Sequence, residues 1–372
     1  MSETNRNEHR PRLAVTLGDV AGVGPEAIVG AWAEPGLHEV CRAVVVGHPE
    51  IVRRAAELLH SVGRTARTAE VVEVDSMDEV DSSPSVIPCL AAGSDEVLEV
   101  VCGRVDARTG KAAYECVVLA TELAQAGDVD GLVTAPLSKA ALRMAGYRYP
   151  GHTELLAELC GVDDFAMMLY LPPGEAAGGP AGLGVVHVTL HTALRDIFQQ
   201  LTPGVITSKC GLADEVMRRL GAGSPRIGVC ALNPHGGEGG LFGDEEQKVI
   251  APAVERGRRL GLDLTGPLPA DALMVAARNG DFDAVVAMYH DQGHIALKLL
   301  GMHRAVNVTL GLPIVRTSVA HGTAVNIAWQ GRAECEGMLA ATRVAAELIR
   351  GRDDSAIVGS RIGLHPEVEG SR

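Results

Sequence analysis

Aromatic side chains are scarce in this chain, whose 372 residues include four Phe, five Tyr and two Trp against 44 Gly. Core packing must therefore rest on Val, Leu, Ala and Ile, with many tight turns between strands and helices. At 47% hydrophobic the chain can bury a full core, and its length predicts two domains or two lobes.

Long apolar runs are missing as well. No stretch reaches the roughly 18–20 residues that would span a bilayer. Residues 1–10 (MSETNRNEHR) lack the apolar core of a secretion signal. The sequence thus predicts a cytoplasmic protein without a membrane partner.

A basic excess is also absent, because the formal net charge is −14 and the pI is near 5.4. A general nucleic-acid binder needs a basic face to neutralise phosphates. No nucleic-acid partner is therefore expected, and an anionic metabolite would have to be held by local cations.

The eight cysteines are spread singly, without a C-x-x-C pair, and most of them lie inside apolar stretches. Such a pattern predicts buried free thiols. It does not favour a disulfide framework or a cysteine metal site.

Short aliphatic or β-branched runs alternate with stretches of helical spacing. The runs are residues 12–17, 42–47, 130–135, 166–171, 184–190, 226–232, 283–289 and 304–310. Helical spacing occurs at 25–32, 112–126, 137–145 and 245–260. This alternation predicts an α/β fold with a mostly parallel, wound sheet. Residues 171–182, of low complexity, are predicted to form a surface hairpin or loop of unknown role.

A glycine-rich turn, TLGDVAGVGPE at 16–26, follows the first predicted strand and leads into a helix. Such a turn can bind an anion, because free backbone N–H groups and the helix dipole point at it. Gly18, Gly22 and Gly24 do not keep the G-x-G-x-x-G spacing of a dinucleotide fingerprint. Nucleotide binding by this turn is therefore the weaker interpretation.

Three histidines, His191, His235 and His290, each follow a predicted buried strand. The carboxyl ends of strands in an open parallel sheet lie at one edge, so distant residues can meet there. Three imidazoles at one edge indicate a divalent metal such as zinc, with a coordination position left for a substrate oxygen. His294 is a weaker candidate ligand, four residues after His290.

Two further stretches carry polar groups with more than one interpretation. In YPGHTELLAEL, His152 and Thr153 could face an anion, but Thr153 could equally cap the helix while His152 packs. After His235, five glycines follow within eight residues. A segment so rich in glycine loses much conformational entropy when it folds. The glycines therefore indicate that its backbone comes close to a ligand or to another backbone.

The segment 307–334 combines Asn307 and Arg316 with hydroxyl side chains and an H-G-T-A turn. An arginine fork matches the geometry of phosphate or carboxylate. In an acidic protein, Arg316 near a strand end is therefore a candidate for holding a small anion.

The chain resembles the 4-hydroxythreonine-4-phosphate dehydrogenase family over nearly its whole length. The motifs occur in order: TLGDVAGVGPE, VTAPLSKAAL, YPGHTE, HTALRDI, LNPHGGEGG, GPLPAD, YHDQG, NVTLGLPIVRTS and HGTA. Within that family, AMMLYL, LFGDEE, YHDQGHIALKLLG and NIAWQGRAE look more like the catabolic branch, which acts on 4-phospho-D-threonate or 4-phospho-D-erythronate.

The resemblance implies the fold of the isocitrate and isopropylmalate dehydrogenases, with two α/β lobes, a cleft between them and a homodimer that completes each site. The expected lobes are 12–135 with 304–359 for the cofactor, and 136–303 for substrate, metal and dimerisation. Loose tails are expected at 1–11 and 360–372.

The resemblance also assigns roles. It implies a divalent cation (Zn²⁺, Mg²⁺ or Co²⁺) bound by His191, His235 and His290, shared across the dimer. The implied substrate-binding residues are His152, Thr153, Lys298, Asn307 and Arg316. The implied cofactor loop contains His321, Gly322, Thr323 and Asn326.

The implied reaction is NAD-dependent oxidation of a secondary alcohol β to a carboxylate, followed by loss of carbon dioxide. A four-carbon phosphorylated acid would give dihydroxyacetone phosphate. Candidate proton acceptors are Lys139, Asp271 and Asp291, which sequence cannot rank.

Two departures from the expected pattern concern the cofactor. Ala320 stands where the family often has Asp, and Asn326 stands where isopropylmalate dehydrogenases have an Asp that grips the ribose. An amide repels a 2′-phosphate less than a carboxylate does. NADP is therefore possible beside NAD.

Several functions stay open at this stage. The substrate could instead be 4-hydroxythreonine 4-phosphate, as in pyridoxal phosphate biosynthesis, or the terephthalate cis-dihydrodiol. Metal-assisted hydrolysis would fit three histidines, and a non-catalytic metabolite-binding module would fit Ala320 and Asn326.

Overall fold

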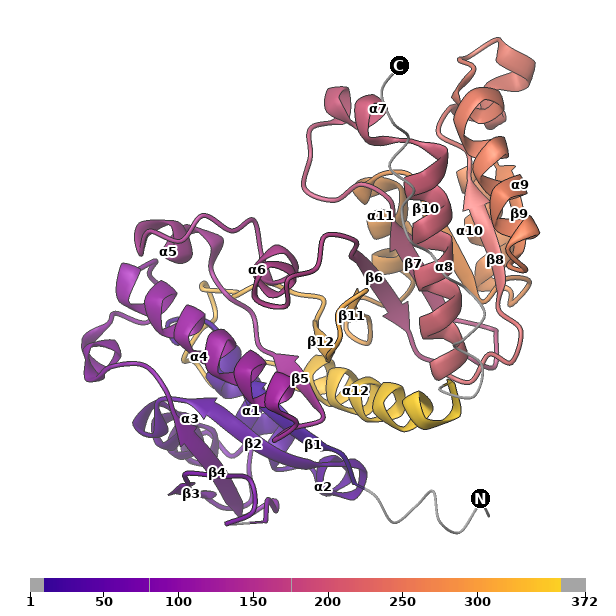
Figure 1. Ribbon diagram of the computed structural model, residues 1–372. Coiled ribbons are helices and arrows are strands. Elements are labelled where there is room, and N and C mark those ends of the chain that lie inside the picture. The colour runs from indigo at the N-terminus through magenta and orange to yellow at the C-terminus, as the bar shows by residue number, and fades with distance from the viewer. Residues whose placement is uncertain (1–9, 80, 175, 356–372) are drawn as a thin grey trace. The chain divides into compact units, whose positions relative to one another are not determined.

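The computed structural model describes residues 10–79, 81–174 and 176–355. The predicted tail 360–372 and most of that at 1–11 lie outside these residues. The chain divides into two compact units: Met1–Asp163 with Met302–Ile349, and Asp164–Gly301 with Arg350–Arg372. Both combine a sheet with covering helices (Figure 1), which confirms the predicted α/β class.

The first unit alternates strands and helices from its start. Its elements are β1 (Arg12–Thr16), α1 (Gly24–Trp32), α2 (Pro35–Val40), β2 (Arg42–Gly47), α3 (Pro49–Ser61), β3 (Glu70–Glu73), β4 (Val86–Ala91), η2 (Asp95–Glu99), α4 (Ala107–Ala126), β5 (Gly131–Thr134), α5 (Lys139–Met144), α6 (His152–Leu159), β11 (Val306–Leu310), β12 (Val315–Val319) and α12 (Glu336–Ser355).

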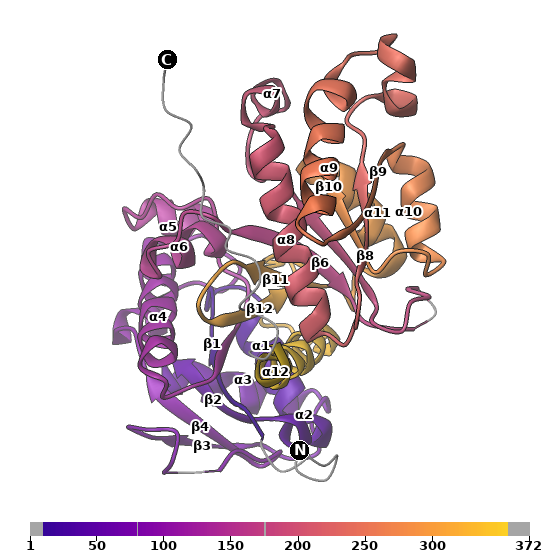
Figure 2. The ribbon, with the colours of Figure 1, turned by 45° about the vertical axis from the view of Figure 1, so that its right-hand side comes forward.

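The sheet of the first unit has the strand order β3-β4-β2-β1-β5-β12-β11. Its strands are parallel except for the antiparallel pair β11 and β12. Helix α4 packs across β1, β2 and β5, whereas α1 and α3 pack together on the other face (Figures 1 and 2). Strands β1 and β2 are almost wholly buried, as strands covered on both faces must be.

The first compact unit extends past residue 135, where the lobe boundary was predicted. Residues 136–163 belong to the first unit. The reason is local packing, because α5 and α6 lie against α4. Leu155 and Leu156 of α6 are fully buried in the same hydrophobic core as Val117 of α4 and Leu132 of β5.

The second unit is built in the same manner. Its elements are β6 (Ala166–Leu171), β7 (Leu183–His187), η3 (Leu194–Asp196), α7 (Ile197–Gln200), α8 (Pro203–Arg219), β8 (Arg226–Cys230), η4 (Pro234–Gly240), η5 (Glu246–Ile250), α9 (Ala251–Arg259), β9 (Asp263–Leu268), α10 (Ala270–Arg278), β10 (Ala284–Ala287) and α11 (His290–Gly301).

Its strand order is β6-β7-β10-β8-β9, with β6 antiparallel and the other pairs parallel. Helices α8 and α9 cover one face, and α10 and α11 cover the other (Figure 2). The carboxyl ends of β7, β10 and β8 therefore share one edge, each followed by a segment that contains a histidine.

All eight predicted strands are present, but β3, β4, β9 and β12 were not predicted. Strand β12 reads VRTSV and carries three polar residues, although it is buried throughout. Strand β9 contains Gly266 and Pro267, which interrupt the apolar pattern. Neither strand matches the apolar run expected for a covered strand.

The insertion at 171–182 connects the antiparallel strands β6 and β7, so it is a hairpin connection as predicted. A short bridge joins Gly174 and Ala177 within it. Five of the eight cysteines are buried as predicted, whereas Cys102 is exposed and Cys160 and Cys335 are partly buried. Among the described residues, no helix has the length and hydropathy to cross a membrane.

Candidate active site

Two of the three predicted metal ligands lie together at the carboxyl ends of β7 and β10. His191 follows β7, and His290 opens α11 just beyond β10. Their ring centroids are 6.0 Å apart. Both line a cavity of about 360 Å³ with Tyr289 and Asp291. The ends of two neighbouring parallel strands thus bring together residues a hundred positions apart.

His290 is held by two neighbours. Its Nδ1 donates to Asp291 Oδ1 at 2.6 Å, and its ring stacks on His294 with centroids 3.8 Å apart and planes at 15°. A proton on Nδ1 leaves the Nε2 lone pair as the donor for a metal. A carboxylate behind an imidazole is a common way to orient a metal-binding histidine.

His187 and His294 form a second pair of imidazoles, which contacts His290 through the ring of His294. His187, the last residue of β7, is fully buried, and its Nδ1 donates to the Met167 carbonyl at 3.2 Å. Its Nε2 then accepts from Nδ1 of His294 at 3.1 Å. Burial lowers the pKa of His187 to about 4 and that of His294 to about 2, so both rings are neutral.

The sequence did not identify His187 as a site residue. It lies within an apolar run, where a histidine is usually interpreted as a buried packing residue. The only available signal was its position at the strand's carboxyl end, four residues before His191.

His235 occupies a separate, strained loop after β8. Its φ is 55°, and the next four residues also have positive φ values. The buried Glu246 holds the start of this loop, accepting from the backbone N–H groups of Leu232 at 2.8 Å and Asn233 at 2.7 Å. A Cβ on Gly237 would come within 2.6 Å of the same carboxylate. Of the five glycines after His235, only Gly237 and Gly243 have a neighbour that a Cβ would meet within 3 Å, and the His235 side chain is exposed.

Within one copy of the described chain, no group of three His, Cys, Asp or Glu side chains is placed to hold a metal ion. The imidazoles of His191 and His290 are nevertheless suitable donors for a divalent cation. A site with three histidine ligands, as predicted, would take its third ligand from elsewhere. The resemblance supplies one in the form of His235 from a second copy, and that division stays a prediction.

The first unit contains a buried cationic cluster around Arg316 of β12. The side chain is 1% exposed. Nη1 donates to Thr309 Oγ1 at 3.0 Å and Nη2 to Thr134 Oγ1 at 2.6 Å. Burial lowers its pKa to about 9, opposed by the negative charge of Glu154, and the guanidinium is still charged at neutral pH. Among the described residues, its Nε has no hydrogen-bond partner.

His152, the first residue of α6, lies beside this guanidinium. Its Nε2 is buried and has no partner in the described part of the chain. Burial, and then the positive charges of Arg316 and Lys139, hold the pKa of His152 well below its ordinary value. Positive charge and unsatisfied nitrogens in one buried place are suited to an anion.

The other predicted substrate residues divide between the units. Thr153 is buried in α6. Asn307 lies half-buried on β11, opposite Ser318 in the β11–β12 register. Lys298 belongs to the second unit, on α11, where His290, His294 and Lys298 recur every four residues along one helix face. Sequence reasoning missed Thr134 and Thr309, whose hydroxyls orient Arg316.

The three candidate bases have different surroundings. Lys139 begins α5, on the surface of the first unit, and its charge acts on His152. Asp271 lies exposed in the first turn of α10. Asp291 is hydrogen-bonded to His290 and therefore orients that ring.

The four predicted cofactor residues lie in the segment 321–331, which borders a cavity of about 360 Å³ in the first unit. His321, Ala324 and Ile327 line it together with Ala333 and Glu334. Gly322 and Asn326 are exposed. Thr323 lies against the glycine-rich turn, since a Cβ on Gly22 would come within 2.8 Å of the Thr323 carbonyl oxygen.

The chain is similar to one protein family and to several named relatives. Residues 39–345 match the family described as pyridoxal phosphate biosynthetic protein PdxA. The chain is 44% identical to D-threonate 4-phosphate dehydrogenase from Salmonella typhimurium over 338 residues, covering 90% of this chain and 98% of that protein. It is also 44% identical to 4-hydroxythreonine-4-phosphate dehydrogenase from Geobacter metallireducens, covering 92% and 96%.

A crystal structure of 4-hydroxythreonine-4-phosphate dehydrogenase from Klebsiella pneumoniae superimposes with a TM-score of 0.78 at 43% identity, covering 91% of this chain and 99% of that one. These relatives are named as dehydrogenases, which confirms the prediction of an oxidoreductase. The family match and the near full-length relatives lead to one conclusion: this chain belongs to the PdxA family.

Proposed function

We propose that the protein is a metal-dependent, NAD(P)-linked dehydrogenase that oxidises and decarboxylates a four-carbon hydroxy acid phosphorylated at C4. The substrate that fits best is 4-phospho-D-threonate or 4-phospho-D-erythronate. In this reaction the C3 alcohol loses a hydride to the cofactor and a proton to a base. The resulting β-keto acid then loses carbon dioxide, giving dihydroxyacetone phosphate.

The observation that carries this proposal is the buried Arg316. A guanidinium out of water is costly unless an anion offsets its charge. Its hydrogen bonds go to two neutral hydroxyls, the negative charge of Glu154 offsets its burial only in part, and its Nε is unsatisfied among the described residues. A phosphate would accept from Nε and draw a proton onto His152 Nε2. A substrate with a phosphate, rather than a neutral polyol, therefore suits this cluster.

The histidine pair supports the metal. A bound divalent cation would supply positive charge beside the hydroxyl that is oxidised and beside the carbonyl that forms. His191 and His290 would hold it from one subunit and His235 from the other, so the active enzyme would be a homodimer. His294 and His187 keep the His290 ring in place.

The cavity beside the cofactor loop supports a nicotinamide dinucleotide, whose oxidised ring accepts the hydride. His321 would lie against the adenosine, and Ala324 and Ile327 would provide apolar contacts. Since Asp291 is engaged with His290, Lys139 and Asp271 are the better candidates for the base.

The choice of substrate is tested by a panel assay. We expect the purified protein, supplied with Zn²⁺, Mg²⁺ or Co²⁺, to reduce NAD or NADP fastest with 4-phospho-D-threonate or 4-phospho-D-erythronate. Absorbance of the reduced nicotinamide and release of carbon dioxide are measured together. A terephthalate cis-dihydrodiol serves as the substrate without phosphate.

The second candidate is 4-hydroxythreonine-4-phosphate dehydrogenase activity, because relatives of both names are equally identical to this chain. Preference for 4-hydroxythreonine 4-phosphate in the same panel would replace the first proposal with this one. Product formation without nicotinamide reduction would indicate hydrolysis. Binding of a phosphorylated acid without any turnover would indicate a metabolite-binding module.

A further prediction concerns Thr309, whose hydroxyl orients Arg316. In Thr309→Val the hydroxyl is replaced by a methyl group, and one buried N–H loses its acceptor. We expect the KM for the phosphorylated substrate to rise about tenfold with little change in kcat, since a lost hydrogen bond of this kind costs roughly 1–2 kcal/mol.

Thr317→Val is the matched control, because Thr317 lies on β12 next to Arg316 but donates to the Ala341 carbonyl. It should lower stability without raising this KM. Equal KM changes in the two variants would contradict an orienting role for Thr309.

A further inference from the structure

The glycine-rich turn at 18–26 contacts the segment 321–331. Its backbone N–H groups are used within the protein: Asp19 donates to the Pro136 carbonyl at 2.8 Å, Ala21 to the Asp19 carboxylate at 3.0 Å, and Val23 to the Thr323 carbonyl at 3.0 Å. The last of these bonds reaches the cofactor loop. The turn therefore packs against residues 321–331.

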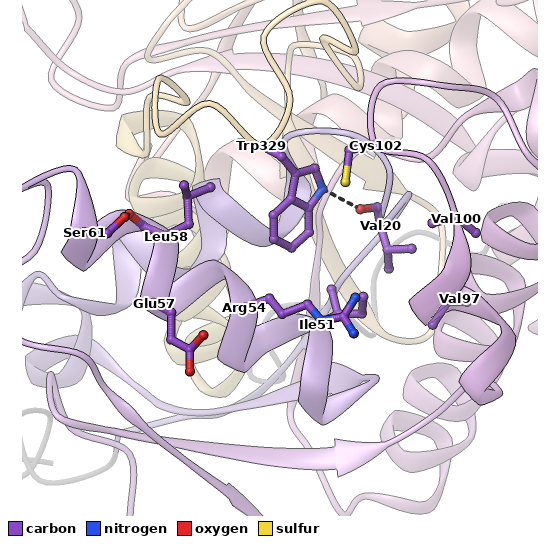
Figure 3. A pocket seen from close by; sticks show the side chains of 10 residues that line it. All are labelled: Val20, Ile51, Arg54, Glu57, Leu58, Ser61, Val97, Val100, Cys102 and Trp329. Carbon is purple, nitrogen blue, oxygen red and sulfur yellow. Dashed lines mark hydrogen bonds between the residues drawn. The ribbon is translucent and has the colours of Figure 1, made fainter.

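The main contact between the two segments is the carboxylate of Glu26, in the first turn of α1. Glu26 is 1% exposed. One oxygen accepts from the backbone N–H of Trp329 at 2.5 Å and the other from that of Gly331 at 2.7 Å. In addition, the indole N–H of Trp329 donates to the Val20 carbonyl at 2.8 Å (Figure 3). Both oxygens of one buried carboxylate are thus committed to one loop.

The loop requires such support because of its backbone. Ala324 has φ 43° and Trp329 has φ 58°, left-handed values that residues with a Cβ rarely adopt. Conformations of this kind persist only where the surroundings over-determine them. Two charge-assisted hydrogen bonds directed at Trp329 and Gly331 meet that requirement.

We propose that Glu26 is a positioning residue for the nicotinamide cofactor. Its carboxylate holds residues 321–331 in the conformation that places His321, Ala324 and Ile327 around the cavity described above. The inference rests on the proposed function, which assigns that cavity to the cofactor. Glu26 itself touches neither cofactor nor substrate.

The test is Glu26→Gln, measured in the full-length, metal-supplied protein. The amide keeps one acceptor oxygen and turns an NH₂ group toward the second backbone N–H. We expect the KM for NAD to rise about tenfold, with the KM for the phosphorylated acid and kcat at saturating NAD unchanged within about twofold. Glu26→Asp retains both oxygens and should recover part of the loss.

A second readout does not require activity. The chain has two tryptophans, Trp32 and Trp329, so labelling with 5-fluorotryptophan gives two ¹⁹F resonances. Trp329 also lines a cavity of about 420 Å³ between α3 and residues 97–102 (Figure 3), where its environment is sensitive to loop movement. In Glu26→Gln the Trp329 resonance should shift or broaden, while that of the buried Trp32 should stay constant.

Two controls separate positioning from general weakening. Glu39→Gln makes the same change at an exposed position and should alter neither readout. Ile87→Val trims the buried β4 and should lower Tm without a selective change in the KM for NAD. The proposal is overturned if Glu26→Gln leaves the Trp329 resonance and the KM for NAD unchanged, or if both KM values rise equally.

Failure of the proposed function would look different. A wild-type protein that reduces neither NAD nor NADP would overturn the proposed function. The role of Glu26 would then be tested by measuring NAD binding by calorimetry and by recording the Trp329 resonance. Equal NAD binding by the wild-type and Glu26→Gln proteins would overturn the positioning role of Glu26, and weaker binding by the variant would support that role.

Discussion

Replacing Arg316 by methionine is expected to weaken binding of the phosphorylated substrate by about 100- to 1,000-fold, which corresponds to roughly 3–4 kcal/mol. The fork of the guanidinium and its charge are both lost. Arg316→Lys keeps the charge without the fork and should lose a similar amount, because a lysine cannot reach the two threonine hydroxyls and the phosphate together. The measurements are the KM for the acid and the rise in Tm caused by inorganic phosphate.

Stability separates a binding role from a structural one. Arg316 donates to two neutral hydroxyls, and the negative charge of Glu154 offsets the cost of its burial only in part, so an apolar side chain of similar length removes a costly buried charge. We expect Arg316→Met to unfold at the same or a higher temperature than the wild type without ligand. A large drop in Tm with an unchanged KM would show that the guanidinium serves the core rather than the substrate.

The second large effect is expected at His290. In His290→Ala the pair with His191 is broken, and turnover should fall by about 10³-fold or more, since charge stabilisation at the reacting oxygen supplies several kcal/mol. Exhaustive chelation of the wild type should have the same effect and be reversed by Zn²⁺ or Co²⁺. The visible spectrum of the Co²⁺ form reports binding independently of activity.

His60→Ala, an exposed histidine on α3, is the matched control and should retain both the spectrum and the activity. Full activity of the chelated wild type would rule out the metal.

Complementation tests whether the ligands come from two subunits. His235→Ala and His290→Ala should each be inactive, yet mixed and refolded together they should recover about a quarter of the wild-type activity, because half of the dimers are mixed and each has one intact site. Without recovery, all the ligands would belong to one chain. The exposed, left-handed position of His235 is the structural reason to expect recovery.

Much of the fold could be predicted because its signals are local. Apolar runs marked eight strands, and helical spacing marked α1, α4, α5 and α9. Strand β12 was not predicted from the sequence, because its Arg and Thr side chains are buried only through long-range partners. The first unit extends past the predicted boundary at residue 135 for a similar reason, since the packing of α6 on α4 leaves no trace in the residues that separate them.

The candidate site divides in the same manner. Strand-end positions predicted that His191, His235 and His290 would meet, because a parallel sheet places such residues at one edge. Within one described chain, His191 and His290 lie together, whereas His235 occupies a separate loop. His187 and the hydroxyls of Thr134 and Thr309 could not be identified, since a buried histidine or threonine within a strand looks the same whether it packs or orients a functional group.

By itself the sequence determined the α/β class, the strand-end histidines and the resemblance to a dehydrogenase family, because all of these depend on short motifs and their order. Only the tertiary structure decided which groups meet. Arg316 is hydrogen-bonded to Thr134, which lies 182 positions away in the sequence, and Glu26 is hydrogen-bonded to Trp329, 303 positions away. Hydrogen bonds act over about 3 Å in space, and no spacing along the chain encodes that proximity.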